Sequence, residues 1–468
     1  MAANSAIPVQ LDQNRIVTDP VRRVMITLTL PILMEQMLST LVGLVDTFLA
    51  GNLENHAVEA TSAVGLASYV GWLVTMLFAL VGTGTTALVA RAYGSGEREY
   101  GNRVANQSIL LAVFMGAFGV CAMYFLAPRF ASWQSMRGIT YDITVRYLRM
   151  ESLSYIGMAI TLVGGAAIRG AGDTRTPMKV LASVNVFNGI LSYGLVYGIG
   201  PLPRMDVDGI VMGTLISRLL GGLILLIVIL VGARGIRLRL QLLRPALEVI
   251  RRITRIGIPA AVDGAIMWTG HFLFLKIIGN MASDVASGLN PSYAAQIVVV
   301  RLEAFTYLPA SAYAAACATM IGQALGANMP KRAIRSGHEG AMQCCMLTAI
   351  SGTLFVIFAR QICGLMHKDS SVIDIATPVL VIAGLAQPVL ALCMVYAGSL
   401  RGAGDTVFPL IYNMCGLGLI RLPFGYLFGL YMGWGLFGAW IAVAADMVAR
   451  MLMMAIRFRR GKWVTLQV

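Results

Sequence analysis

The stretch AIRGAGDTRTPM, residues 167–178, recurs 232 positions later as SLRGAGDTVFPL, residues 399–410. The same offset carries ALVARAYGSG, residues 87–96, onto TMIGQALGAN, residues 319–328. A repeat at a fixed spacing is typical of a duplicated structural unit. The chain is therefore predicted to consist of two related halves.

The sequence on both sides of this motif is strongly apolar. Of 468 residues 57% are hydrophobic and 12% are charged, and the mean hydropathy is +0.75. A soluble domain carries about 25% charged residues, so the composition excludes an ordinary water-soluble protein. One spanning helix needs ~20 apolar residues. Twelve apolar segments of that kind lie at residues 25–49, 60–88, 106–127, 144–168, 177–199, 208–232, 254–279, 292–325, 338–358, 373–398, 408–431 and 435–456.

These segments predict an all-α integral membrane protein with twelve transmembrane helices in two six-helix lobes. A membrane barrel would show alternating strands rather than unbroken apolar runs. Six spans per copy make the repeat parallel, with a pseudo-two-fold axis along the membrane normal. The predicted parts are an N-terminal tail (1–24), an N-lobe (25–232), a basic linker (233–253), a C-lobe (254–456) and a C-terminal tail (457–468).

The net charge of +14 is distributed unevenly between the loops. By our count 24 of the 36 Lys and Arg residues lie on the side of the termini and the linker, against at most five on the other side. Cytoplasmic loops are enriched in Lys and Arg. We therefore expect a plasma or inner membrane protein with cytoplasmic termini, and the basic charge does not indicate nucleic-acid binding.

Carboxylates inside spans are costly and are functional candidates by default. Glu35 and Asp263 each follow a proline, Pro31 or Pro259, by four residues, so the repeat places an acid at the same depth in both lobes. Asp46 lies near the outer end of the first span. A buried carboxylate can bind Na⁺ or take up a proton. This interpretation is favoured for Asp46, whereas a structural role stays open for the other two.

Two further acids lie in the second half of the chain. Glu303 lies two residues after Arg301, a spacing at which two side chains of a helix do not face each other. Its predicted partner is therefore Lys276 in the preceding span. Both a functional and a structural role are open for Glu303. Asp446 precedes Arg450 by four residues, a spacing that favours a structural salt bridge within one helix.

The repeated RGAGDT segments are predicted to be turns that fix helix packing. Glycines suit a tight turn, and an aspartate followed by threonine can cap the next helix. No strand precedes the motif and no GKS or GKT follows it, so it is not a phosphate loop. The motif residues are Arg169, Gly170, Gly172, Asp173, Arg401, Gly402, Gly404 and Asp405.

An enzyme is not expected. The four histidines are scattered without a metal-binding or catalytic spacing. The seven cysteines lie in apolar stretches and have no metal-ligand spacing. No cofactor is predicted other than a coupling ion.

The chain resembles the multidrug and toxic compound extrusion (MATE) family of secondary transporters. The resemblance rests on LTLPILME with GLVDTFLAG (28–35 and 43–51), GTGTTALVARAYGSG (82–96), LPASAYAAACATMIGQALGA (308–327) and the doubled RGAGDT. It covers almost all of the chain outside the tails. It implies two six-helix lobes, alternating access, and efflux of amphipathic, often cationic organic compounds by antiport against Na⁺ or H⁺.

The resemblance also points to ion-coupling positions. Asp46 matches a span-one aspartate implicated in coupling, and Asn188 matches a span-five asparagine, which suggests a site for Na⁺ at Asp46 and Asn188. Ser192 stands where one branch of the family has a second aspartate. In another branch the acids lie in spans seven and ten, where this chain has Met267 and Leu390, although Asp263 lies one turn earlier.

Two alternatives share the predicted architecture. One is a lipid-linked oligosaccharide flippase, which the scarcity of basic residues in mid-span disfavours. The other is an exporter of one specific metabolite. In every case the expected partners are small organic molecules and the lipid bilayer, and the protein is expected to be a monomer.

Overall fold

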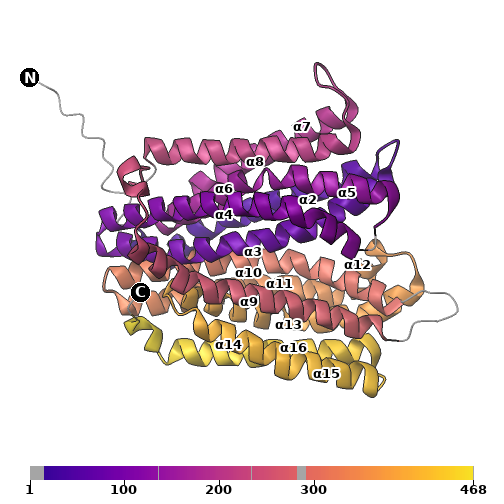
Figure 1. The fold of residues 1–468 in the computed structure, drawn as a ribbon. Helices are drawn as coiled ribbons and strands as arrows, with labels where there is room; N and C mark the ends of the chain where they lie inside the picture. The colour runs from indigo at the N-terminus through magenta and orange to yellow at the C-terminus, as the bar shows by residue number, and fades with distance from the viewer. Residues whose placement is uncertain (1–14, 135, 233–234, 282–290, 467–468) are drawn as a thin grey trace, which may run out of the picture. The chain divides into compact units, whose positions relative to one another are not determined.

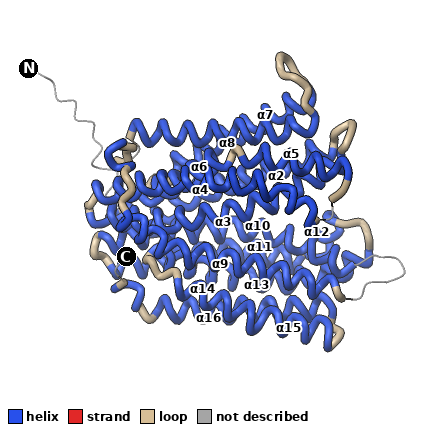
Figure 2. The backbone as a smooth tube through the Cα atoms, viewed as in Figure 1, coloured by secondary structure: helices blue, strands red, loops and turns tan. Residues whose placement is uncertain are grey.

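The computed structural model describes residues 15–134, 136–232, 235–281 and 291–466 (Figure 1). These residues form helices joined by short loops (Figure 2). In chain order the elements are α1 (Arg15–Thr18), α2 (Val21–Gly51), α3 (Ala57–Ser95), α4 (Arg98–Trp133), α5 (Gly138–Ser152), α6 (Tyr155–Gly170), α7 (Arg175–Tyr197), α8 (Asp206–Val231), η1 (Leu240–Leu243), α9 (Leu247–Gly279), α10 (Pro291–Gly326), α11 (Pro330–Ile357), α12 (Ala359–Met366), α13 (Ser370–Gly402), α14 (Val407–Cys415), η2 (Gly416–Arg421), α15 (Leu422–Tyr426), η3 (Leu427–Tyr431), α16 (Gly435–Arg459) and η4 (Lys462–Thr465).

The predicted all-α membrane fold is confirmed. Within the described residues, 11 stretches of helix are long and apolar enough to cross a bilayer, and the bent pair α5 and α6 raises the number to 12. The segment predicted at residues 144–168 is thus two helices, which meet at 45° between Ser152 and Tyr155. Residues 1–14, 233–234 and 467–468 of the predicted tails and linker lie outside the described residues.

The chain forms two compact units, whose boundaries fall inside helices rather than in loops. One unit is Leu30–Ile258, and the other combines Met1–Thr29 with Pro259–Val468. The divisions lie in α2 and α9, next to the repeated prolines. The first turns of α2 are therefore packed with the second half of the chain, and the first turns of α9 with the first half.

In the unit Leu30–Ile258, glycines let the helices approach closely. A Cβ at Gly222 of α8 would lie 2.8 Å from the Cα of Gly157 in α6. A Cβ at Gly213 would overlap with Ser192 of α7. Small residues at such crossings permit close helix packing within a membrane. The crossings hold α8 against both α6 and α7, which positions the polar side chains on α8.

The basic linker is fastened to α4 by buried amide side chains. The main-chain nitrogens of Arg237 and Arg239 donate to Asn102 Oδ1 (2.8 Å) and Asn106 Oδ1 (2.9 Å). Gln107 Nε2 donates to the carbonyls of Leu242 and Arg244. Side-chain amides here satisfy main-chain groups that no helix or strand pairs. In its described part, the linker is a fixed strap.

In the other unit, α13 packs against α10, α11 and α16. A Cβ at Gly402 would overlap with Ala318 of α10, so these helices touch through their backbones. The start of the chain joins this unit, because Arg332 donates to the carbonyls of Ile16 (2.7 Å) and Asp19 (2.5 Å).

Part of the predicted C-terminal tail is also packed. Trp463 in η4 is fully buried, and its ring stacks on Phe458 with a centroid distance of 4.8 Å. Its indole nitrogen donates to the Phe458 carbonyl at 2.8 Å. A buried tryptophan normally has its N–H satisfied in this way, and this bond anchors η4 to the end of α16.

The segment predicted as span eleven is not a regular α-helix. It alternates between the α-helices α14 and α15 and the π-helical stretches η2 and η3. π-Helical turns are rare and frequently lie at functional sites. Here η2 ends at Arg421, one of the buried charged residues described below.

Candidate functional site

A buried polar cluster surrounds Asp46 in the unit Leu30–Ile258. Thr214 of α8 donates to Asp46 Oδ2 at 3.5 Å. Asn188 of α7 donates from Nδ2 to Thr214 Oγ1 (3.2 Å) and to Ser192 Oγ (3.4 Å). The two positions predicted for ion coupling, Asp46 and Asn188, are therefore joined through the hydroxyl of Thr214.

A second charged pair beside this cluster escaped the sequence analysis. Arg218 Nη1 donates to Glu151 Oε1 at 2.9 Å and to Ser154 Oγ at 3.2 Å. Glu151 is buried at the end of α5, where the helix pair α5 and α6 is broken. The signal in the sequence was an acid within the apolar segment 144–168 and an arginine within the segment 208–232.

Three acceptor atoms of these side chains have no hydrogen-bond partner within the described residues. They are Asp46 Oδ1, Asn188 Oδ1 and Glu151 Oε2. Each belongs to a side chain that is more than nine-tenths buried. An unsatisfied buried acceptor is costly, so a group that donates to it or carries positive charge would be stabilised there.

The predicted acids Glu35 and Asp263 both pair with the arginine of an RGAGDT segment. Arg169 Nη1 lies 2.9 Å from Glu35 Oε1. Arg401 pairs with Asp263 Oδ2 in the same manner. The internal repeat thus produces one ion pair in each unit, between the helix that carries the proline and the turn motif.

The turns of the two motifs share a backbone conformation but differ at the aspartate. Gly172 and Gly404 have φ of 94° and 90°, values that L-residues with a side chain rarely adopt. Asp173 Oδ1 accepts from the main-chain nitrogens of residues 175 and 176, both at 3.0 Å, as expected of a cap. Asp405 also accepts a main-chain hydrogen bond, from Phe408 at the equivalent position, and in addition accepts from Arg457 of α16 at 2.9 Å.

The unit containing Pro259–Val468 holds a continuous charged network. Asp446 accepts from Arg421 and from Arg450, each at 2.8 Å. Arg450 also donates to Asn413 Oδ1 (3.2 Å), and Asn413 Nδ2 donates to Asp263 Oδ1 (2.7 Å). The predicted bridge between Asp446 and Arg450 is present, and Arg421 is an additional partner that spacing did not indicate.

Glu303 lies in the electrostatic field of Arg421 and Arg450. The expected ion pair with Lys276 is absent from the described part of the chain, so that prediction was wrong. Lys276 was predicted because it lies in the preceding span. The charges that act on Glu303 are instead Arg421 and Arg450, in the last two spans.

The sequence profile of the MatE family matches residues 31–194 and 259–427, one match for each copy of the internal repeat. The chain belongs to the MatE family. MATE proteins are membrane transporters and not enzymes, so the chain is a transporter of this family.

Individual MATE relatives align along nearly the whole chain. The probable multidrug resistance protein NorM of Thermotoga maritima is 29% identical over 443 residues, which are 95% of this chain and 93% of the relative. The FAD transporter of Shewanella oneidensis is 23% identical over 88% of this chain and 89% of its own length. A crystal structure of MATE in the bent conformation shares the fold, with a TM-score of 0.87, 20% identity and coverage of 96% and 98%.

Met267 and Leu390 occupy the two positions at which the resemblance to another MATE branch would place acids. Met267 contacts Arg450 through its sulfur, at 3.8 Å, and Leu390 is buried in an apolar core. Asp263, one turn before Met267, is already bonded to Arg401 and Asn413. Asp263 is thus tied into the charged network of its unit.

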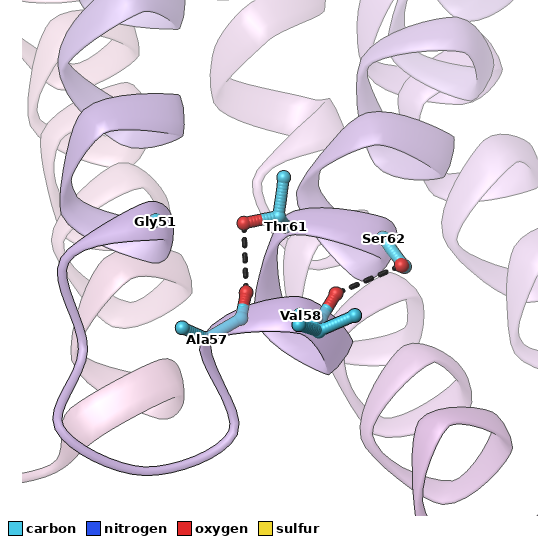
Figure 3. A pocket seen from close by; sticks show the side chains of 5 residues that line it. All are labelled: Gly51, Ala57, Val58, Thr61 and Ser62. Carbon is cyan, nitrogen blue, oxygen red and sulfur yellow. Dashed lines mark hydrogen bonds between the residues drawn. The ribbon is translucent and has the colours of Figure 1, made fainter.

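A shallow pocket lies at the turn between α2 and α3. Gly51, Ala57, Val58, Thr61 and Ser62 line it. Its two hydroxyls donate back to the carbonyls of Ala57 and Val58 (Figure 3). Since these groups are satisfied by their own helix, we assign the pocket no role in transport.

Proposed function

We propose that this MATE protein exports amphipathic, often cationic organic compounds by antiport against an inward cation gradient, H⁺ or Na⁺. The single observation that supports this function best is the buried Asp46 cluster with its unpartnered acceptor atoms. An isolated carboxylate within a membrane protein is costly, and binding a cation or a proton offsets that cost. Names of relatives such as NorM support the drug class.

The same proposal includes the surroundings of the transporter. The excess of Lys and Arg in loops on the side of the termini supports a plasma or inner membrane location with cytoplasmic termini. The two lobes would alternate access to a substrate, and the chain would act as a monomer with the bilayer and small organic molecules as its partners. Na⁺ or H⁺ is the only ion the mechanism needs.

Efflux of ethidium from proteoliposomes, under H⁺ and Na⁺ gradients imposed separately, tests the proposal. One of the two gradients should accelerate dye movement. Asp46→Asn should abolish the acceleration and leave the melting temperature (Tm) of the purified protein close to that of the wild type. Acceleration by neither gradient, or full acceleration in Asp46→Asn, would contradict antiport through Asp46.

An exporter of one specific metabolite is the second candidate. The relative named FAD transporter supports it, and so do three arginines, Arg401, Arg421 and Arg450, joined to the network of the second unit. Guanidinium groups recognise phosphate well. Uptake assays in the same vesicles with FAD and ethidium distinguish the candidates, because a dye exporter moves ethidium and is not inhibited by FAD. A lipid-linked oligosaccharide flippase would move neither compound.

A further inference from the structure

The break between α5 and α6 places charged groups inside a span. The two helices have 15 and 16 residues, so the break lies near the middle of the pair. Irregular backbone at membrane depth is tolerated only where it is buried in protein or lines an aqueous cavity, and broken helices form ion sites in transporters. Glu151, Ser154 and the Arg218 that binds both are located at this break.

Arg218 and Thr214 extend from the same side of α8, because they are four residues apart. Thr214 donates to Asp46, and Arg218 binds Glu151. Arg218 and Glu151 also act on Asp46 through their charges. The two contacts therefore belong to one electrostatic cluster, which consists of Asp46, Thr214, Arg218 and Glu151.

Among the described residues, the remaining titratable neighbours of this cluster are tyrosines. Tyr147 of α5 lies in the field of Asp46, Glu151 and Arg218, and Tyr155 of α6 lies in the field of the latter two. The residues of α7 that bond to the cluster or to each other beside it, Asn188 and Ser192, are neutral. With tyrosines neutral, two carboxylates and one guanidinium sum to a charge of −1.

We propose that Glu151 and Arg218 are positioning residues of the ion-coupling site, and that Arg218 acts as a built-in cation that leaves Asp46 to take up a single proton. This inference rests on the proposed antiport function. A guanidinium stays charged throughout. It compensates one carboxylate permanently, so one proton brings the cluster to neutrality. It also repels a metal ion, so the site selects H⁺ over Na⁺.

Removing either partner changes the charge of the cluster in opposite directions. In Glu151→Gln, Arg218 is the charge left near Asp46. Because the guanidinium stabilises the ionised carboxylate of Asp46, protonation of Asp46 needs a lower pH. Arg218→Gln leaves two carboxylates together, so protonation occurs at a higher pH and Na⁺ becomes an acceptable ligand. Shifts of about one to three pH units are expected from charges this close. The double variant again has a cluster charge of −1, so its pH midpoint should equal that of the wild type.

Two control variants separate charge from damage to the fold. Arg146 of α5 and Asp208 of α8 form an ion pair between the same two helices at 3.0 Å, more exposed than Glu151 and Arg218. Asp208→Asn should leave the pH midpoint unchanged. Arg218→Lys keeps the positive charge and should retain both the wild-type midpoint and the lack of a Na⁺ response.

The experiment measures the pH midpoint in two ways. Ethidium efflux from proteoliposomes gives the midpoint of transport, and Tm of the purified protein against pH, in NaCl or choline chloride, gives the midpoint without transport. We expect wild-type efflux to respond to a pH gradient and not to Na⁺, opposite shifts in the two single variants, and stabilisation by NaCl only in Arg218→Gln. Unshifted midpoints in both folded single variants, or stabilisation of the wild type by Na⁺, would overturn the inference.

The two readouts also separate this inference from the proposed function. If ethidium responds to neither gradient but the Tm midpoints shift as expected, the drug-antiport function is wrong and the charge cluster stands. If efflux is driven by a pH gradient but the midpoints of the variants coincide, antiport stands and the roles of Glu151 and Arg218 are refuted.

Discussion

Arg169 Nη1 lies 2.9 Å from Glu35 Oε1, and both side chains are largely buried, at 18% and 13% exposure. The pair fixes the helix that contains Pro31 to the first RGAGDT turn, and Arg401 with Asp263 does the same at the second turn. An ion pair that occurs once in each repeat serves the architecture common to both copies. From this geometry we infer a structural role for Glu35 and Asp263.

Glu35→Gln should lower stability by about 1–3 kcal/mol, the usual worth of a hydrogen bond to a charged group. The reason is that Arg169 would retain its charge in a largely buried place without its partner. Tm in detergent measures the effect. The exchange Glu35→Arg with Arg169→Glu should recover part of the loss, whereas a Glu35→Gln protein as stable as the wild type would show that the pair contributes nothing.

Asp446→Asn should be more damaging, at about 3–5 kcal/mol, because both Arg421 and Arg450 are buried and would lose their shared carboxylate. Asp374→Asn is the matched control. Its partner Arg360 is 69% exposed and Asp374 is 57% exposed, so that variant should leave Tm nearly unchanged. Equal effects of the two substitutions on Tm would argue against a structural role for the network.

Gly416→Ala should destabilise the protein by about 1–3 kcal/mol, because overpacking forces neighbouring groups to move. The added methyl group would overlap with the side chains of Asp446 and Arg450. Gly418 lies in the same stretch, η2, and a Cβ there would meet nothing within 4 Å. Gly418→Ala should therefore have little effect on Tm, and a similar loss in both variants would point to η2 itself rather than to the charged network.

Asn106→Ala should release the linker from α4. The substitution removes the acceptor of the Arg239 nitrogen and the donor to the Arg237 carbonyl. Limited digestion with trypsin should cut after Arg237 and Arg239 several-fold faster than in the wild type. Asn185→Ala is the control, since Asn185 Nδ2 has no hydrogen-bond partner in the described chain. Unchanged cleavage in Asn106→Ala would show that the strap is held elsewhere.

The fold was predictable because its signals are local or periodic. Apolar runs indicate spans wherever they occur, and the two RGAGDT segments reveal the repeat by simple comparison. The pairing of charges was less accessible. Asp446 and Arg450 lie four residues apart on one helix, so their bridge follows from helical geometry, but Arg421 reaches Asp446 only because η2 and α16 pack together.

Glu151 and Arg218 show the limit most clearly. They are 67 residues apart, and they meet because Gly157 and Gly222 allow α6 and α8 to touch. Nothing in the sequence around either glycine indicates which helix it contacts. The break after Ser152 has no proline to mark it either. A contact that depends on the crossing point of two helices is set by packing across the whole unit, which local patterns do not encode.

The division of α2 between the two units has a consequence for biosynthesis. Arg332 binds the carbonyl of Ile16, a residue made 316 positions earlier. At about 5–20 residues per second, Ile16 is synthesised roughly 15 to 60 s before Arg332. The first turns of α2 therefore exist long before the residues of the unit into which they pack. A chain cut at the linker gives two fragments, neither of which contains all the helical segments of one compact unit.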